Sequence, residues 1–479
     1  MDFKKNGLHF DMIYSELEDA AGRGNVETSS ADRYVQSVDY YWVPRVVADR
    51  GGEPEEADFI IRPDNAQQIS KVMQVANYYK IPVTVWGGGS GSQGGALPLY
   101  GGIILDTKKM CRVLDVNERA YTATAEAGII QQDFEWAVNR RGYSLMHLPA
   151  SIGCGTLGGF LAHRGTGVVS TKYGKIEDLV INLEVVLPTG EIIQTLPVPR
   201  NASGPDLNQL FVGSEGCYGI ITRATLKMFD LPEERRFRAF MFRNLHDAYE
   251  AGREIMTRRL GPCVVRLFDE NETTHHVKKV LGLDREGAYL VFGFDGPKDM
   301  VDLQEKKAID ICSKTAYEDL GAEGGNSWWE NKYKFYFPPY IYDLPRAFGT
   351  MDTVATYDKM ENVYWGMKKA IETTYPQCRF IAHFSHWYEW GVMCYDRFIL
   401  EEKDVPADPH EATRLYNDIW STGVHAALEN GGIINEHHGI GIKLGRFMRE
   451  QYGPAFKVLE AVKAGLDPNG IMNPGKAGL

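Results

Sequence analysis

The first part of the chain alternates short apolar runs with a segment of helical periodicity. Residues 59–61 and 81–86 are apolar runs that predict strands, and Pro63 closes the first of them. Between them, Asn65 stands where it can cap a helix whose apolar positions recur every three or four residues: Ile69, Val72, Met73, Val75 and Ala76. A strand, a helix and a second strand in this order indicate an α/β architecture.

This pattern continues to about residue 230 and then changes. It predicts strands at 103–106, 112–116, 120–127 and 179–187, a helix at 131–141, and a hairpin turn at 188–190. A further strand follows the cluster of small residues at 211–222 and runs to Met228. Beyond 232, aromatic residues crowd into two groups: Trp328, Trp329, Tyr333, Phe335, Tyr336, Phe337, Tyr340 and Tyr342, then Phe384, Trp387, Tyr388, Trp390 and Tyr395. Single aromatics usually pack in a core, but at this density we expect several to line a pocket. A final helix is predicted from 446 to 464.

Three clusters of glycine and small residues interrupt the pattern. The first, at 87–95, follows a predicted strand at once; the second and third lie at 149–159 and 211–222. Glycine lets successive backbone N–H groups converge on a negative group, so the first loop predicts a site for the pyrophosphate of a nucleotide. Three clusters beside strands or helix starts indicate one extended ligand along a sheet edge. A flexible linker is the alternative reading of the first loop.

Composition narrows the class of protein. The net charge of −12 disfavours nucleic-acid binding, so an anionic ligand must be held locally by backbone amides and single basic residues. The seven scattered cysteines form no CxxC pair, which predicts a reduced, intracellular protein. The N-terminal segment reads as an amphipathic helix without a signal core, and no membrane span is expected. The C-terminal residues do not form a peroxisomal address. We therefore expect a cytoplasmic location.

The order of these segments resembles the flavin-binding oxidoreductases of the vanillyl-alcohol oxidase/4-cresol dehydrogenase type. The resemblance rests on the 87–95 loop, the 153–159 stretch, YGKIED at 173–178, GSEGCYGIIT at 213–222 and LDPNGIMNPGK at 466–476. It covers most of the chain. Trp86 departs from it, because many relatives carry arginine before the loop.

The resemblance implies an α+β fold: a PCMH-type FAD-binding domain of two α/β subdomains, with an α+β cap domain. The expected boundaries are 1–230 for the FAD domain, 231–430 for the cap and 431–479 for a C-terminal segment that returns to the FAD domain. It implies FAD as cofactor, and a homodimer, since related enzymes are often dimers. The residues expected to bind FAD are Trp86, Gly87, Gly88, Gly89, Ser90, Gly91, Ser92, Gln93, Pro149, Ser151, Gly153, Thr156, Gly158, Gly159, Glu215, Gly219, Ile220, Ile221 and Asn473.

Within the family, the chain is most similar to the branch of alkyl-dihydroxyacetone-phosphate synthase and the D-2-hydroxyacid dehydrogenases. The likeness lies in 265–269 with Arg266, in 385–391 followed by Tyr395, and in 436–441. Glu436 stands where the synthase has a third histidine, and Ile442 is an additional residue before Lys443 that the synthase lacks. These departures weaken the case for ether-forming chemistry.

Alcohol oxidation by flavin needs a base for the hydroxyl proton while hydride leaves carbon. His437 or His438 suits this role, and the other would only stabilise the loop. Tyr395 is expected to share the proton work or bind the hydroxyl, and Arg266 to pair with a substrate carboxylate or phosphate unless it forms a salt bridge between domains. Lys443 is a weaker second candidate for anion contact.

The favoured prediction is an FAD-dependent oxidoreductase for a small 2-hydroxy acid or a larger, flat hydroxylated compound, with an unknown electron acceptor. The alternative is a transferase of the synthase kind, in which flavin carries a covalent adduct without net redox. A flavin-binding protein without catalysis is the third possibility. We expect non-covalent FAD, because the 87–95 loop has no histidine and Cys154 is out of register. No metal is expected, although His383, His386 and Glu436 could meet in space.

Overall fold

The computed structural model describes residues 7–49, 51–335 and 348–479. The N-terminal half contains a small sheet in the order β1 (Val26–Glu27), β2 (Phe59–Ile61), β4 (Ile103–Asp106), β3 (Val83–Trp86). Strands β2, β4 and β3 run parallel, and α4 (Ala66–Tyr79) connects β2 to β3. The predicted cap is confirmed, since the Asn65 side chain accepts a hydrogen bond from the Gln68 amide.

The second sheet is antiparallel, in the order β5 (Val113–Asn117), β6 (Thr122–Glu126), β10 (Ile220–Lys227), β8 (Val180–Val186), β9 (Ile192–Gln194). The predicted hairpin is β8–β9, and its turn closes with a hydrogen bond from the Gly190 amide to the Leu187 carbonyl. Helices α5 (Gln131–Asn139) and α6 (Leu157–His163) contribute Phe134 and Phe160 to the core of this half.

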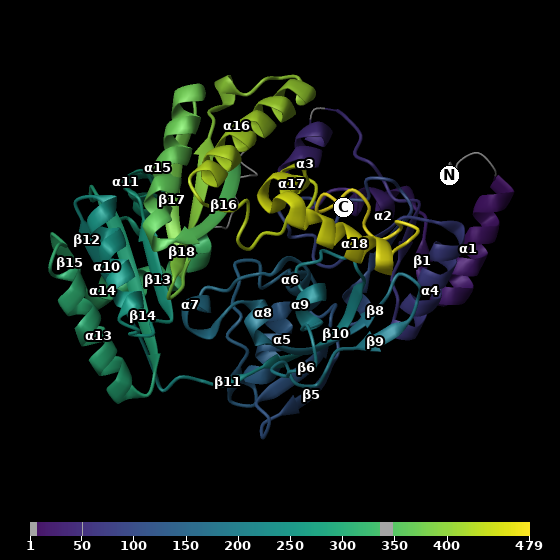
Figure 1. Cartoon of the computed structure of the whole chain (residues 1–479), viewed down its shortest axis with the longest axis horizontal. Coiled ribbons are helices and arrows are strands. Elements are labelled where there is room, and N and C mark those ends of the chain that lie inside the picture. The colour runs from purple at the N-terminus through teal and green to yellow at the C-terminus, as the bar shows by residue number, and fades with distance from the viewer. Residues whose placement is uncertain (1–6, 50, 336–347) are drawn as a thin grey trace.

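The cap contains a seven-stranded antiparallel sheet, at the left of Figure 1. Its order is β15 (Glu318–Leu320), β12 (Glu234–Phe242), β14 (Ala288–Gly296), β13 (Val264–Phe268), β17 (Arg379–Trp387), β18 (Gly391–Ile399), β16 (Phe348–Thr356). One face packs into a large hydrophobic core with α10 (Leu245–Thr257), α13 (Lys298–Cys312), α15 (Tyr357–Thr374) and α16 (Pro409–Glu429). Because alternate residues of a strand point to opposite faces, the polar residues between these core positions face the other way. Part of that second face packs on α14 (Gly321–Asn331), and the rest lines a large cavity.

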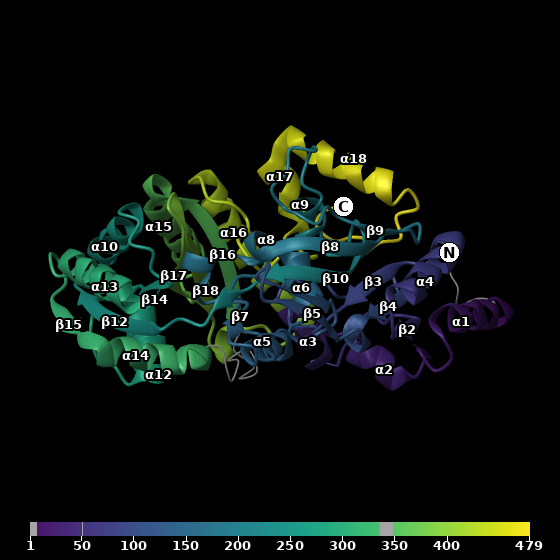
Figure 2. The ribbon, with the colours of Figure 1, turned by 90° about the horizontal axis from the view of Figure 1, so that it is seen from below.

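The C-terminal segment returns to the first sheet. Met472 forms a parallel bridge with Val83, flanked by hydrogen bonds of 2.7 Å from the Val83 amide to the Ile471 carbonyl and from the Asn473 amide to the Val83 carbonyl. Figure 2 shows α18 (Phe456–Leu466) on this side of the molecule, near α17 (Met448–Tyr452). The single helix expected at 446–464 is therefore wrong. Gly453 adopts φ 52° and Pro454 lacks an N–H group, so the helix breaks between α17 and α18.

Three further expectations concern the domain boundaries, the first aromatic group and membrane spans. The boundaries near 230 and 430 stay predictions, although β11 (Phe229–Asp230) ends where the first lies and α16 ends just before the second. Tyr336, Phe337, Tyr340 and Tyr342 of the first aromatic group lie outside the described residues. Among the described helices, none combines the length and apolar character needed to cross a membrane.

Candidate active site

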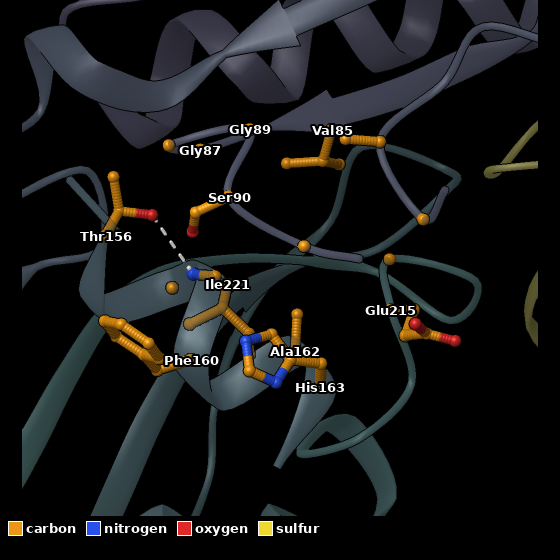
Figure 3. Close-up of a pocket in the computed structure, with 18 of the residues that line it drawn as sticks. Val85, Gly87, Gly89, Ser90, Thr156, Phe160, Ala162, His163, Glu215 and Ile221 are labelled. Carbon is orange, nitrogen blue, oxygen red and sulfur yellow. Dashed lines mark hydrogen bonds between the residues drawn. The ribbon is translucent and has the colours of Figure 1, made fainter. Parts of the chain in front are cut away.

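The glycine loop between β3 and β4 forms one wall of a narrow cavity of about 120 Å³ (Figure 3). It packs against the second glycine cluster without room for side chains. A Cβ added at Gly87 would lie 2.4 Å from Thr156 Oγ1, and one at Gly88 would lie 2.1 Å from the Cys154 carbonyl oxygen. At Gly91 a Cβ would have no neighbour within 4 Å, so this side of the loop is open. The loop therefore presents backbone to the cavity, as an anion site requires.

Several buried polar atoms along the cavity walls have no partner among the described residues. These atoms are Oε1 and Nε2 of the Gln93 side chain, Ser92 Oγ, Thr166 Oγ1 and Ser385 Oγ. Buried polar atoms in native proteins are nearly always hydrogen-bonded, so a polar ligand is expected to complete them. FAD fits this demand, because it brings a pyrophosphate, ribityl hydroxyls and a ring with donors and acceptors.

Nearly all residues expected to bind the cofactor line one of two adjoining cavities. The narrow cavity is lined by Gly87, Gly88, Gly89, Ser90, Gly91, Gln93, Thr156, Gly158, Gly159, Glu215, Gly219, Ile220 and Ile221. The second is lined by Ser92, Pro149 and Ser151, and it shares 88–91 with the first. Trp86, Gly153 and Asn473 line neither. Trp86 is buried beneath the loop, 2.6 Å from where a Cβ of Gly89 would stand. The Asn473 side-chain amide donates to the Gly95 and Glu215 carbonyl oxygens, so it joins the first and third clusters.

The second cavity measures about 680 Å³ and lies between the glycine loop and the polar face of the cap sheet. Arg266 on β13 and Tyr395 on β18 both reach it, as expected, and Arg266 is only 5% exposed. Arg397 lines the same cavity two positions after Tyr395, and it was not among the residues predicted from the sequence. Alternation along β18 could have found it, because Met393, Tyr395 and Arg397 share one face of the strand.

A bulge in β17 turns an additional histidine toward this cavity. The register shifts between Ser385 and Trp387, and His386 adopts φ 51°. Ser385 and His386 therefore both line the cavity, although they are consecutive. His383 faces the cavity from the same strand; its Nδ1 lies 3.2 Å from the Glu272 carboxylate, and its ring stacks on Tyr395 at 4.8 Å. Burial lowers the pKa of His383 to about 3, so this ring is neutral.

Asp352, on β16, organises the loop that carries the two candidate bases. Its buried carboxylate accepts hydrogen bonds from the backbone amides of Glu436 and His437, at 2.8 and 2.9 Å, and from the Asn435 side chain. His438 Nδ1 donates to the same carboxylate at 2.6 Å. Asp352 was not among the residues predicted from the sequence, because a single acid within a strand gives no signal of its own.

The two histidines have opposite electrostatic environments. His437 Nδ1 lies between two carboxylates, 3.0 Å from Asp352 and 2.9 Å from Glu436. Burial alone would lower the pKa of His437, but these two carboxylates outweigh it and raise the pKa to about 9. Burial and the neighbouring His437 cation lower the pKa of His438, in spite of Asp352. At neutral pH His437 is therefore a cation and His438 a neutral imidazole.

Glu436 links the histidine loop to the N-terminal half of the chain. Lys175 Nζ lies 3.0 Å from its carboxylate and donates to its backbone carbonyl at 2.7 Å. Its carboxylate also accepts from His386 and from the Tyr388 hydroxyl. Burial would raise the pKa of Glu436, but Lys175 and His386 outweigh it and hold the pKa well below its ordinary range.

Comparison with known proteins gives the chain its family. Residues 57–196 match the family described as the FAD binding domain, and residues 231–477 match that described as the FAD linked oxidases, C-terminal domain. The chain belongs to the FAD-linked oxidase family. It is therefore an FAD-dependent enzyme with a PCMH-type FAD-binding domain, and the resemblance and fold class stated above are confirmed.

Named relatives of this FAD-linked oxidase differ in their reactions. It is 28% identical to alkyldihydroxyacetonephosphate synthase of Trypanosoma brucei brucei, over 89% of this chain and 74% of the relative. It is 27% identical to a mitochondrial D-lactate dehydrogenase (cytochrome) of Arabidopsis thaliana, over 88% and 73% of the two chains. A solved alkyldihydroxyacetonephosphate synthase superposes with a TM-score of 0.79 at 25% identity, covering 97% of this chain and 85% of the other. p-Cresol methylhydroxylase superposes at 0.80 with 18% identity, over 99% and 98%, which shows the shared fold.

Within the part of this FAD-linked oxidase that the structure describes, two groups of side chains are close enough to hold a metal ion. One is Asp352, His437 and His438; the other is His386, Glu436 and His437. Of the metal-site candidates weighed from the sequence, His386 and Glu436 do meet, whereas His383 pairs with Glu272. Lys175 and His437 already supply positive charge to these carboxylates. The expectation of no metal stays a prediction.

Proposed function

We propose that this FAD-linked oxidase oxidises a hydroxyl-bearing carbon of an organic substrate in the larger cavity. Bound FAD supplies the hydride acceptor, and the residues of the chain hold the substrate and take its proton. The substrate is a 2-hydroxy acid or a larger aromatic, hydroxylated compound. The observation that carries this proposal is the position of His438, which is hydrogen-bonded to a buried carboxylate and lines both cavities.

His438 is the base in this proposal. Because Asp352 can only accept, the proton of the neutral ring sits on Nδ1 and Nε2 carries the lone pair for the substrate hydroxyl. Asp352 then stabilises the imidazolium that forms. His437, already a cation, fixes the loop and adds positive charge beside the developing negative oxygen. Tyr395, whose ring centroid lies 5.3 Å from that of His438, binds or shares the hydroxyl proton.

Arg266 is proposed to bind the acidic group of the substrate. Its buried guanidinium lies over Trp328 at 5.6 Å, which holds the planar fork against the cavity wall. Tyr40, Tyr41, Phe335, Tyr395 and Tyr416 provide aromatic wall for the remainder of a larger substrate. Lys443 is a poorer anion contact than expected, because its ammonium donates to the Thr350 carbonyl and lies over Trp420.

The proposal is tested by mixing the holoenzyme anaerobically with a panel of 2-hydroxy acids and hydroxylated aromatic compounds. A substrate should bleach the oxidised flavin band, which should stay bleached until an acceptor is added. Oxygen, a quinone and an electron-transfer protein are then compared as acceptors. Acid precipitation should release the yellow colour into the supernatant, because we propose that FAD is bound non-covalently. Colour that stays with the precipitate would contradict that part.

A synthase-type transferase is the second candidate, and the synthases among the relatives favour it. In that reaction an acyl-glycerone phosphate and a long-chain alcohol react without consuming an acceptor. Turnover of this pair, with no bleaching by any alcohol of the panel, would replace the redox proposal. We also propose that the enzyme is a homodimer and that it is located in the cytoplasm. The seven free cysteines support a reducing compartment. Sedimentation of the purified enzyme tests the dimer.

A further inference from the structure

A short segment before the first matched family region forms part of both cavities. Residues 38–41 line the larger cavity, and Asp39 also lines the narrow one. The segment is held at both ends. The Tyr40 amide donates to the Gly89 carbonyl of the glycine loop at 2.9 Å, and the Tyr41 ring stacks on Trp420 of cap helix α16 at 6.2 Å. Asp39 therefore has a fixed position above the glycine loop.

The residues shared by the two cavities mark where a flavin ring would lie if it received hydride from a substrate in the larger cavity. Hydride transfer requires contact between the ring and the substrate, so the ring has to reach the junction of the cavities. The shared residues are Asp39, Gly88, Gly89, Ser90, Gly91, Phe160, His163 and His438. Of these, only Asp39, His163 and His438 are ionisable. His438 is the proposed base, and His163 Nδ1 donates to the His437 carbonyl at 3.0 Å.

At this junction, one carboxylate oxygen of Asp39 accepts no hydrogen bond from the described residues. The Tyr41 amide donates to Oδ1 at 2.8 Å, whereas Oδ2 is buried and has no hydrogen-bond partner among the described residues. A buried carboxylate oxygen without a donor is costly, so a ligand group is expected to complete it. We propose that Asp39 contacts the flavin at the junction and, when ionised, makes the cofactor harder to reduce. The inference rests on FAD binding and on the proposed hydride transfer to FAD from a substrate in the larger cavity, but not on which substrate that is.

The physical basis is repulsion between a fixed negative charge and the electrons that enter the ring. Asp39 Oδ2 is buried, so this repulsion is screened less than it would be at the protein surface. Burial raises the pKa of Asp39 to about 7, although the Tyr41 backbone amide, the Lys476 ammonium and the Ala96 backbone amide act against it. The charged or titratable described groups that face it are Lys476 from the C-terminal segment, Tyr41 from its own segment, and His163 and His438 across the junction. The effect should therefore be large at pH 8, where Asp39 is ionised, and small at pH 6.

The experiment compares flavin midpoint potentials of the holoenzyme and its variants by anaerobic titration against reference dyes. Asp39→Asn should shift the potential in the positive direction at pH 8 and by much less at pH 6. Asp39→Glu keeps the charge and should stay near the wild-type potential. Glu53→Gln removes an equal charge from an exposed site outside both cavities and should change nothing.

FAD content, from the ratio of flavin to protein absorbance, shows that equally loaded proteins are compared. Asp39→Ser removes the same charge and replaces Asp39→Asn if the latter does not load. A potential equal to that of the wild type at both pH values, in a loaded variant without the charge, would overturn the inference. Because no substrate is added, this outcome is distinct from a failure of the substrate panel.

Discussion

Asp352 controls the proposed base without touching the substrate. Its carboxylate fixes the loop through two backbone amides and holds the His438 proton on Nδ1. In Asp352→Asn the amide can turn an N–H group toward His438, which favours the wrong tautomer. We expect flavin reduction by substrate to slow by ~10²–10⁴-fold, the usual contribution of a general base, with FAD content unchanged. Stopped-flow bleaching measures this rate. His410→Ala, at an exposed helix start, serves as control; equal losses in both variants would contradict the role of Asp352.

His437 makes stability depend on pH in a direction that follows from its charge. Its pKa in the folded protein, about 9, lies above the ordinary value of 6.5. The ion pairs with Asp352 and Glu436 therefore stabilise the fold fully below pH 6.5, and this contribution is lost as the pH rises through about 9. Thermal unfolding of the holoenzyme between pH 6 and 10 should show the decline, and His437→Asn should flatten it. An identical pH profile in the variant would refute the assignment of charge to His437.

The activity profile should report the other histidine. His438 acts only when neutral, and its pKa lies below 6.5, so the rate of flavin reduction should rise with pH and level off below that value. A falling limb is expected near pH 9 if loss of the His437 charge weakens the stabilisation of developing negative charge. These limbs are measured from the initial rate of bleaching at saturating and at low substrate.

Individual site residues could be predicted from the sequence where they belong to a recognisable motif. Four residues were predicted because the sequence around each of them resembles segments of the family: His437, His438, Tyr395 and Arg266. All four line one cavity in the structure. Asp352 and Glu272 were missed because their importance comes from long-range pairing. Asp352 pairs with Tyr395 across β16 and β18, and Glu272 contacts His383. Neither pairing can be recognised from the residues next to it in the sequence.

Among the elements, the loop after the histidines joins the cap to the glycine loop. Gly441 adopts φ 50°, and a Cβ there would lie 2.0 Å from the Gln93 carbonyl oxygen. The Ile442 amide donates to that same oxygen at 3.0 Å. Gly441→Ala should therefore separate the two loops, weaken FAD binding and lower the unfolding temperature of the holoenzyme.

A matched glycine gives the control for this experiment. Gly465 lies inside α18, and a Cβ there has no neighbour within 4 Å. Gly465→Ala should leave FAD affinity unchanged and stabilise the helix by up to ~1 kcal/mol. FAD affinity is measured by quenching of flavin fluorescence on reconstitution of the apoprotein. Equal affinities of the two variants would show that contact at Gly441 is dispensable.

Elements with strong local signals were predictable, and those decided by tertiary packing were not. The cap at Asn65 and the β8–β9 turn depend on neighbouring residues and were found. The bulge at His386 was not, because it depends on how β17 pairs with β18. The break at Gly453–Pro454 had a local signal, and it was overlooked in favour of the apolar periodicity around it.

The whole molecule depends on contacts between distant parts of the chain. Lys175 of the FAD-binding half and Glu436 of the returning segment are 261 positions apart, yet the Lys175 ammonium binds both the side chain and the backbone of Glu436. The order of the motifs that carry the family resemblance implied that the two chain ends meet, but the pairing of Lys175 with Glu436 is visible only in the folded structure. Both side chains are almost fully buried, so the pair couples the two halves in a low-dielectric setting.

Lys175→Met should therefore be far more disruptive than loss of an exposed ion pair. It leaves the Glu436 carboxylate buried with one fewer cation, which typically costs about 3–5 kcal/mol. Glu436→Gln leaves Lys175 with Glu177 as its remaining carboxylate partner at 3.3 Å, so it should cost less. The double variant should recover part of the loss, because neither charge is then left without its partner.

Urea denaturation of the FAD-loaded protein measures these differences, and flavin release reports whether the two halves separate first. Lys298→Met is the control: Lys298 and Asp302 form an exposed pair one helical turn apart, worth at most ~1 kcal/mol. We expect flavin release to precede loss of helix signal in Lys175→Met, because the histidine loop is detached from the FAD-binding half before either half unfolds. A denaturation midpoint in Lys175→Met equal to that in Lys298→Met would mean that the two halves are held together elsewhere.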